Sequence, residues 1–189
     1  MMLRRLGVLV GAAALLWCGE ASAARTTWSA TLYAGPSSTA FVTEILDGKF
    51  DVNGGMVGLA VDRGLFRLAP GISIAGEMQV TSFFGKYAYQ TGALGLGLRF
   101  DGYPFDSSVP ISFAVFTGPS YAPNAPIILD PKPHPDPKFL NYVSLELGVG
   151  MSRDWDMTLR AYHRSGAWGL YSNTADTGSM IGIGFRRKF

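Results

Sequence analysis

The chain is poor in the residues that build disulfides, metal centres and charged surfaces. It has one cysteine, Cys18, and two histidines among 189 residues. A single cysteine excludes an internal disulfide, and so few histidines and cysteines leave no set with the ligand spacing of a zinc site. Charged residues are only 16% of the chain, with 16 Lys and Arg against 14 Asp and Glu. This near balance provides no basic patch, so we expect no nucleic-acid partner.

Long apolar runs are missing as well, because no segment after the first residues reaches the ~18 apolar residues of a transmembrane helix. The beginning of the chain is different. Arg4 and Arg5 precede an apolar stretch, and Ala21-Ser22-Ala23 follows it. A basic start, an apolar centre and a small-x-small site indicate a secretory signal peptide that is cleaved after residue 23. We therefore predict a signal peptide over 1–23 and one exported domain over 24–189.

Cys18 also invites interpretation as a lipoprotein cysteine. The bulky Trp17 directly before it disfavours lipidation. We expect this only cysteine to leave with the signal peptide.

What the exported domain does have is alternation of apolar and polar residues with the period of two of β-strands. Eight such stretches cover residues 27–35, 55–62, 71–83, 86–100, 111–121, 140–151, 155–165 and 178–189. The connections after the first, fifth and seventh stretches are long, and those after the second, fourth and sixth are mostly short. Outer-membrane barrels show this asymmetry, with the short turns and both chain ends in the periplasm. The sequence predicts an all-β fold, an eight-stranded antiparallel outer-membrane β-barrel.

Charged residues fall on the polar faces of these stretches, at Glu77, Arg99, Glu146 and Arg160. A dry sandwich core would not hold so many charges, whereas an eight-stranded barrel has an interior that side chains just fill. We therefore predict a filled interior rather than a pore. A secreted β-sandwich is the alternative fold with the same periodicity.

Five aromatic residues lie near the predicted strand ends, where an aromatic girdle would meet the membrane interface. They are Trp28, Tyr87, Tyr89, Trp155 and Trp168. The last stretch alternates and closes on Phe189, which resembles the ending of bacterial outer-membrane barrels that the assembly machinery recognises. We expect location in the outer membrane, and we expect Arg186, Arg187 and Lys188 to meet phosphates of inner-leaflet headgroups.

His163 and Ser165 are the reactive pair of the chain. Residues two apart in a strand share a face, and these two continue the apolar set Met157, Leu159 and Ala161. We therefore expect them on the lipid-facing surface, near the extracellular end of the seventh strand. There the imidazole could activate the hydroxyl as a nucleophile. The alternative is that two polar residues merely mark the end of the lipid-facing band.

About the last fifty residues, from Phe139-Leu140-Asn141-Tyr142 onward, resemble lipid A 3-O-deacylases of the PagL type and related acyloxyacyl-hydrolase-like outer-membrane barrels. The resemblance rests on His163-Arg164-Ser165, Asn173 and an acid before the last strand. It implies a carboxylic ester hydrolase of lipopolysaccharide that needs no cofactor. His163 would be the general base and Ser165 the nucleophile. Asn173 would lie near the oxyanion site, and Gly166 stands where the family usually has asparagine.

The third catalytic member departs from the family, whose acid lies twelve residues after the serine, where this chain has Thr177. We expect Asp176, rather than Thr177 or the inward-facing Glu146, to approach His163. By parity Asp176 faces inward unless a β-bulge re-aims it. A non-catalytic structural or lipopolysaccharide-interacting barrel is the alternative function.

Overall fold

The computed structural model describes residues 28–38, 47–49, 51–101, 110–124, 138–167, 169–171 and 176–189, and only the backbone of residues 176–178. The predicted signal peptide, Trp168 and Asn173 lie outside the described residues.

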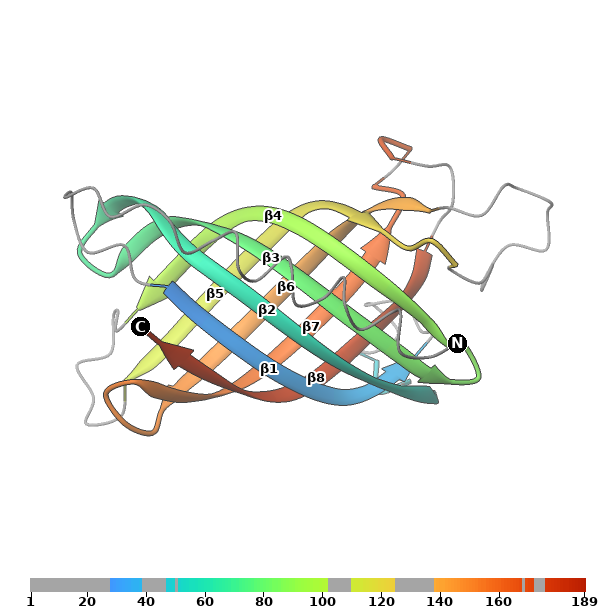
Figure 1. Ribbon diagram of the computed structural model, residues 1–189, viewed down its shortest axis with the longest axis horizontal. Helices are drawn as coiled ribbons and strands as arrows, with labels where there is room; N and C mark the ends of the chain where they lie inside the picture. The colour runs from blue at the N-terminus through green and yellow to red at the C-terminus, as the bar shows by residue number, and fades with distance from the viewer. Residues whose placement is uncertain are drawn as a thin grey trace, which may run out of the picture.

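Eight antiparallel strands, each hydrogen-bonded to the next, close into a barrel when β8 pairs with β1 (Figure 1). The strands are β1 (Trp28–Ser38), β2 (Val52–Ala69), β3 (Ile72–Gly85), β4 (Tyr89–Asp101), β5 (Ile111–Tyr121), β6 (Phe139–Gly150), β7 (Trp155–Ser165) and β8 (Asp176–Lys188). Within the described ranges, no helix has the length and apolar character needed to cross a membrane. The predicted barrel is confirmed.

The predicted strand bounds agree at 111–121 and 155–165 but are wrong for the second strand, which extends to Ala69 rather than residue 62. The pairing of β2 with β3 shifts register between Gly64 and Phe66 and again between Arg67 and Ala69. Such irregularities interrupt the alternation of faces. A strand identified by its period of two therefore stops too early.

The two faces of the barrel wall have opposite chemistry. In β7, Thr158, Arg160 and Tyr162 are buried inside, whereas Met157 and Leu159 are 45% and 48% exposed outside. This arrangement, with apolar residues outside and polar residues inside, is typical of a membrane barrel. We call the outward-facing residues of the eight strands the outer wall.

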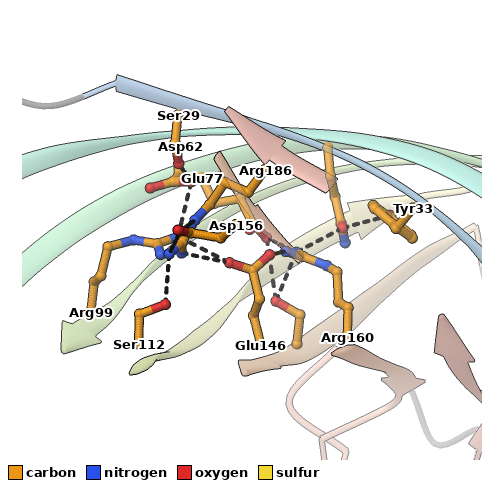
Figure 2. A network of polar contacts seen from close by, with 12 residues as sticks. Ser29, Tyr33, Asp62, Glu77, Arg99, Ser112, Glu146, Asp156, Arg160 and Arg186 are labelled. Carbon is orange, nitrogen blue, oxygen red and sulfur yellow. Dashed lines mark hydrogen bonds and ion pairs between the residues drawn. The ribbon is translucent and has the colours of Figure 1, made fainter. Parts of the chain in front are cut away.

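The interior is filled by a network of ion pairs (Figure 2). Arg160 donates from Nη2 to Glu77 Oε1 at 2.5 Å and from Nη1 to Glu146 Oε2 at 3.0 Å. Arg186 donates to the other oxygen of Glu146 at 3.0 Å and also pairs with Asp156. The buried charged residues that the structure describes are Asp62, Glu77, Glu146, Asp156, Arg99, Arg160, Arg164 and Arg186. Arg99, Arg160 and Arg186 pair with these four acids, which makes burial of the charges tolerable. Arg164 instead donates to Ser120 Oγ at 2.9 Å.

Two placements expected from the sequence are wrong. Arg186 does not meet headgroups, because it has the inward parity of the residue after Phe185 and is 2% exposed. Tyr89 is not in an outer girdle. It starts β4 with the inward parity of Thr91 and stacks on Phe83 inside the barrel, with ring centroids 4.4 Å apart.

Strand β1 starts and strand β8 ends at the same end of the barrel, on the left of Figure 1. The first residue of β1 is Trp28 and the last of β8 is Lys188. We call this end of the barrel the terminal end and the opposite one the distal end. The strands are staggered, so a line of cross-strand partners climbs the wall. The line that starts at Trp28 returns to β1 at Ser38, which is 38 − 28 = 10 residues further along the chain. It runs through Arg63, Gly76, Leu96, Thr117, Val143, His163 and Ser179. We call it the Trp28 row.

Candidate functional site

His163 and Ser165 lie at the distal end of β7, as the last outward-facing residues of that strand. Both are partly exposed and continue the outward set that contains Leu159, while Arg164 between them is buried in the interior. The structure therefore places an imidazole and a hydroxyl beside each other on the outer wall, next to the apolar outward residues of β7, as the spacing of two requires.

The histidine ring contacts a residue that the sequence did not single out. Ser179 of β8 is the cross-strand partner of His163, and its Oγ lies 3.0 Å from His163 Nδ1. Ser179 is only 3% exposed, so it is not accessible as a nucleophile toward a bulky substrate. Parity could have revealed it, because Ser179 continues the outward set Ile181 and Ile183 of β8 just as His163 continues that of β7.

A β-bulge lies in β8 directly beside the pair. His163 pairs with Ser179, whereas Ser165 pairs with Asp176, so two residues of β7 span three of β8. Regular pairing would place Thr177 opposite Ser165. The extra residue instead puts the backbone of Asp176 there, and directly opposed residues of an antiparallel pair share a face. The register thus brings Asp176 beside Ser165 in the ladder.

The chain turns sharply after Ser165. Ala167 has a φ of 49°, in the left-handed region that non-glycine residues rarely adopt. The turn is closed by hydrogen bonds from the Tyr171 N–H to the Gly166 carbonyl and from the Leu170 N–H to the Ala167 carbonyl, both 3.1 Å. Strained backbone of this kind occurs preferentially at functional sites.

Glu146 does not join the site. Its side chain is 1% exposed and accepts hydrogen bonds from Arg99, Arg160 and Arg186 in the interior. The sequence excluded it on the same ground of parity. Within the part of the chain that the structure describes, no group of three histidine, cysteine or acidic residues is placed to hold a metal ion.

A closed eight-stranded barrel with an apolar outer wall and a filled polar interior defines the outer-membrane type of β-barrel. Solved barrels of this type are similar to the chain. The outer-membrane enzyme PagL matches with a TM-score of 0.59 and 10% identity, over 84% of this chain and 98% of PagL.

Two further solved barrels are more distant. The Yersinia pestis outer-membrane protein Ail matches with a TM-score of 0.46 and 9% identity, over 85% of this chain and 99% of Ail. The outer-membrane protein OprG from Pseudomonas aeruginosa matches with a TM-score of 0.43 and 10% identity, over 87% of this chain and 96% of OprG. No protein-family model and no curated relative matches the sequence. The likeness to PagL establishes the fold.

Proposed function

We propose that the protein is a serine esterase of the bacterial outer membrane that removes an ester-linked acyl chain from lipid A. The observation that carries the proposal is the outward pair His163 and Ser165 at the distal end of β7, with His163 held by Ser179. Polar side chains on a membrane-facing wall are costly and are typically retained for function. With the chain ends in the periplasm, the distal end meets the outer leaflet, where lipopolysaccharide lies.

In the proposed reaction the Ser165 Oγ attacks the ester carbonyl carbon and transfers its proton to His163. The protonated imidazole then gives that proton to the departing alkoxide, which leaves an acyl chain on Ser165. Water attacks this acyl-enzyme with His163 again as base, which releases the fatty acid and restores the serine. No cofactor enters the reaction.

The tautomer of His163 decides whether this is possible. When Nδ1 carries the proton and donates it to Ser179 Oγ, the Nε2 lone pair is available to Ser165. Ser179 is thus a positioning residue. The backbone register supports Asp176 as the acid that stabilises the imidazolium, because it is paired with Ser165. Asn173 and Gly166 are the residues that we propose near the oxyanion.

Mass spectrometry of lipid A from cells with and without the protein tests the proposal. We expect the loss of one acyl chain with the natural protein and with Ser82→Ala, which alters an outward-facing serine of β3 far from β7. We expect no loss with Ser165→Ala. Loss that persists in Ser165→Ala would contradict the assignment of the nucleophile. No loss with the natural protein would favour the alternative, a structural or lipopolysaccharide-interacting barrel.

Two variants test whether Asp176 is the acid of the proposed catalytic triad. Asp176→Asn should lower the deacylation rate by about 10⁴-fold if a carboxylate stabilises the imidazolium, as in triad enzymes. If Ser179→Ala lowers the rate and Asp176→Asn leaves it unchanged, the histidine works with Ser179 alone.

Location and assembly form a further part of the proposal. Phe189 is 68% exposed and its N–H donates to the Trp28 carbonyl at 2.9 Å, so its side chain is accessible to the outer-membrane assembly machinery. Fractionation should recover the protein only in detergent-extracted outer membranes. Recovery from the soluble periplasm would contradict the location.

A further inference from the structure

An apolar groove of about 650 Å³ crosses the outer wall over β1 to β5, on a different part of the barrel from the candidate site. It begins at Trp28 and Arg63, passes over Gly76 and Leu96, and ends at Thr117. These five residues are consecutive members of the Trp28 row. The groove therefore follows the line of cross-strand partners as it climbs from the terminal end.

The floor of the groove is Gly76, the outward-facing residue of β3 that has no side chain to fill it. Leu94 and Leu96, which are 58% and 60% exposed, line it from β4. Glu77 contributes only backbone, because its side chain is buried against Arg160 inside the barrel. The surface offered to a ligand is thus hydrocarbon-like and elongated.

One end of the groove carries a positive charge. Among the described residues that line it, Arg63 is the one basic side chain, and its guanidinium lies 5.0 Å from the Trp28 ring centroid. Elsewhere at the terminal end, the Arg187 guanidinium lies 5.7 Å from the ring centroid of Trp155 and 5.1 Å from that of Phe189. Aromatic and basic residues of this kind mark the membrane interface. Arg63 is therefore at headgroup depth, where a charge on a barrel wall costs little.

The length of the groove matches one leaflet. Four inter-strand spacings from β1 to β5 are about 19 Å. With strands tilted by about 40° from the barrel axis, a line perpendicular to them climbs about 12 Å along the axis. Half of the hydrocarbon core is about 15 Å. A lipid acyl chain that lies in the groove and starts at the membrane interface near Arg63 would thus end near the bilayer midplane.

We propose that this groove binds one acyl chain of an anionic phospholipid from the leaflet at the terminal end, with the lipid phosphate on Arg63. The inference rests on the membrane location in the proposed function but not on its hydrolytic reaction. The positive charge of Arg63 favours a lipid with an anionic headgroup. The aromatic and basic residues at the terminal end place that headgroup at this end of the groove and the acyl chain toward the bilayer midplane.

Native mass spectrometry of the full chain tests this after transfer into nanodiscs of equal parts phosphatidylglycerol and phosphatidylcholine. We expect one retained lipid, predominantly phosphatidylglycerol. Gly76→Phe should retain none, because the nearest atom to a Cβ at this position is Cδ1 of the flexible Leu65 side chain, at 3.3 Å, and the ring can occupy the groove. Ala34→Phe, on the outer wall away from the groove, should retain the lipid. Leu96→Trp provides a second blocking variant if Gly76→Phe does not fold.

The headgroup is tested separately. Arg63→Gln should lower the preference for phosphatidylglycerol over phosphatidylcholine about fivefold, the effect of one basic residue near an anionic surface. Arg67→Gln on the same strand should not change it. Equal retention of both lipids by the natural chain, or retention by both blocking variants, would overturn the proposal. So would a dimer that Gly76→Phe converts to a monomer. Lipid A deacylation stays unchanged in these variants, so failure here is distinguishable from failure of the esterase proposal.

Discussion

Two glycines of the β3–β4 pair show how the side of the wall decides the effect of a single methyl group. A Cβ at Gly95 would lie 1.9 Å from Tyr142 Oη, whereas the nearest atom to one at Gly76 would be Leu65 Cδ1, at 3.3 Å. The Tyr142 ring is itself held, since its hydroxyl donates to Glu77 at 3.3 Å. Glycine is thus required at position 95, where the Tyr142 hydroxyl approaches the backbone closely, but it is not required at the outward position 76.

Gly95→Ala should therefore lower the free energy of unfolding by about 1–3 kcal/mol, the usual cost of overpacking. Gly76→Ala should raise it by up to about 1 kcal/mol, because alanine in a strand loses less conformational entropy than glycine on folding. Urea unfolding in detergent micelles, followed by tryptophan fluorescence, measures both. Equal destabilisation of the two variants would mean that Tyr142 moves aside.

Arg160 is the residue whose loss should harm the interior most. It is fully buried and pairs with both Glu77 and Glu146. Arg160→Met would leave two buried carboxylates without this partner, and breaking a buried pair costs about 3–5 kcal/mol. Arg187→Met, on the exposed side of β8, is the matched control and should change stability by less than about 1 kcal/mol. The same unfolding measurement applies, and similar values for the two variants would contradict the buried network.

At the scale of the element, the bulge in β8 decides which residue of that strand lies opposite Ser165 in the candidate site. It changes the partner of Ser165 from Thr177 to Asp176. Cysteine pairs report this register directly, because directly opposed residues in an antiparallel ladder have Cα atoms about 4.5–5.5 Å apart, within the range of a disulfide.

With Cys18 replaced by alanine, Ser165→Cys combined with Asp176→Cys should form a disulfide on mild oxidation. Ser165→Cys combined with Thr177→Cys should remain reduced. Gel mobility with and without reductant, supported by peptide mass spectrometry, measures the outcome. Cross-linking of the second pair alone would show a regular β8 and would remove Asp176 from the site.

For the whole molecule, the network that three arginines and four acids form among the described residues leaves the barrel plugged, in contrast to wide barrels with an aqueous channel. We expect the protein in planar lipid bilayers to show no stable ohmic conductance. Heat-modifiable gel mobility of the same sample confirms that it is folded. Steady single-channel currents from the folded sample would mean that the network opens.

The sequence by itself determined the strands and their faces. Alternation with a period of two is a local property, so it identified eight strands, the outward position of His163 and Ser165, and the inward charges Glu77 and Glu146. The predicted positions of Tyr89 and Arg186 were wrong because they were made without regard to side-chain parity. The predicted end of the second strand was wrong because the β2–β3 irregularities interrupt the alternation.

Only the tertiary structure decided which outward residues are neighbours. Ser179 beside His163, Asp176 opposite Ser165 and the groove from Trp28 to Thr117 all depend on the register between strands. Register is set by bulges, stagger and closure of the barrel, which couple residues far apart in the chain. A periodic pattern in one strand is unchanged when its neighbour slides by two residues, so the sequence specified the faces while barrel closure fixed the site.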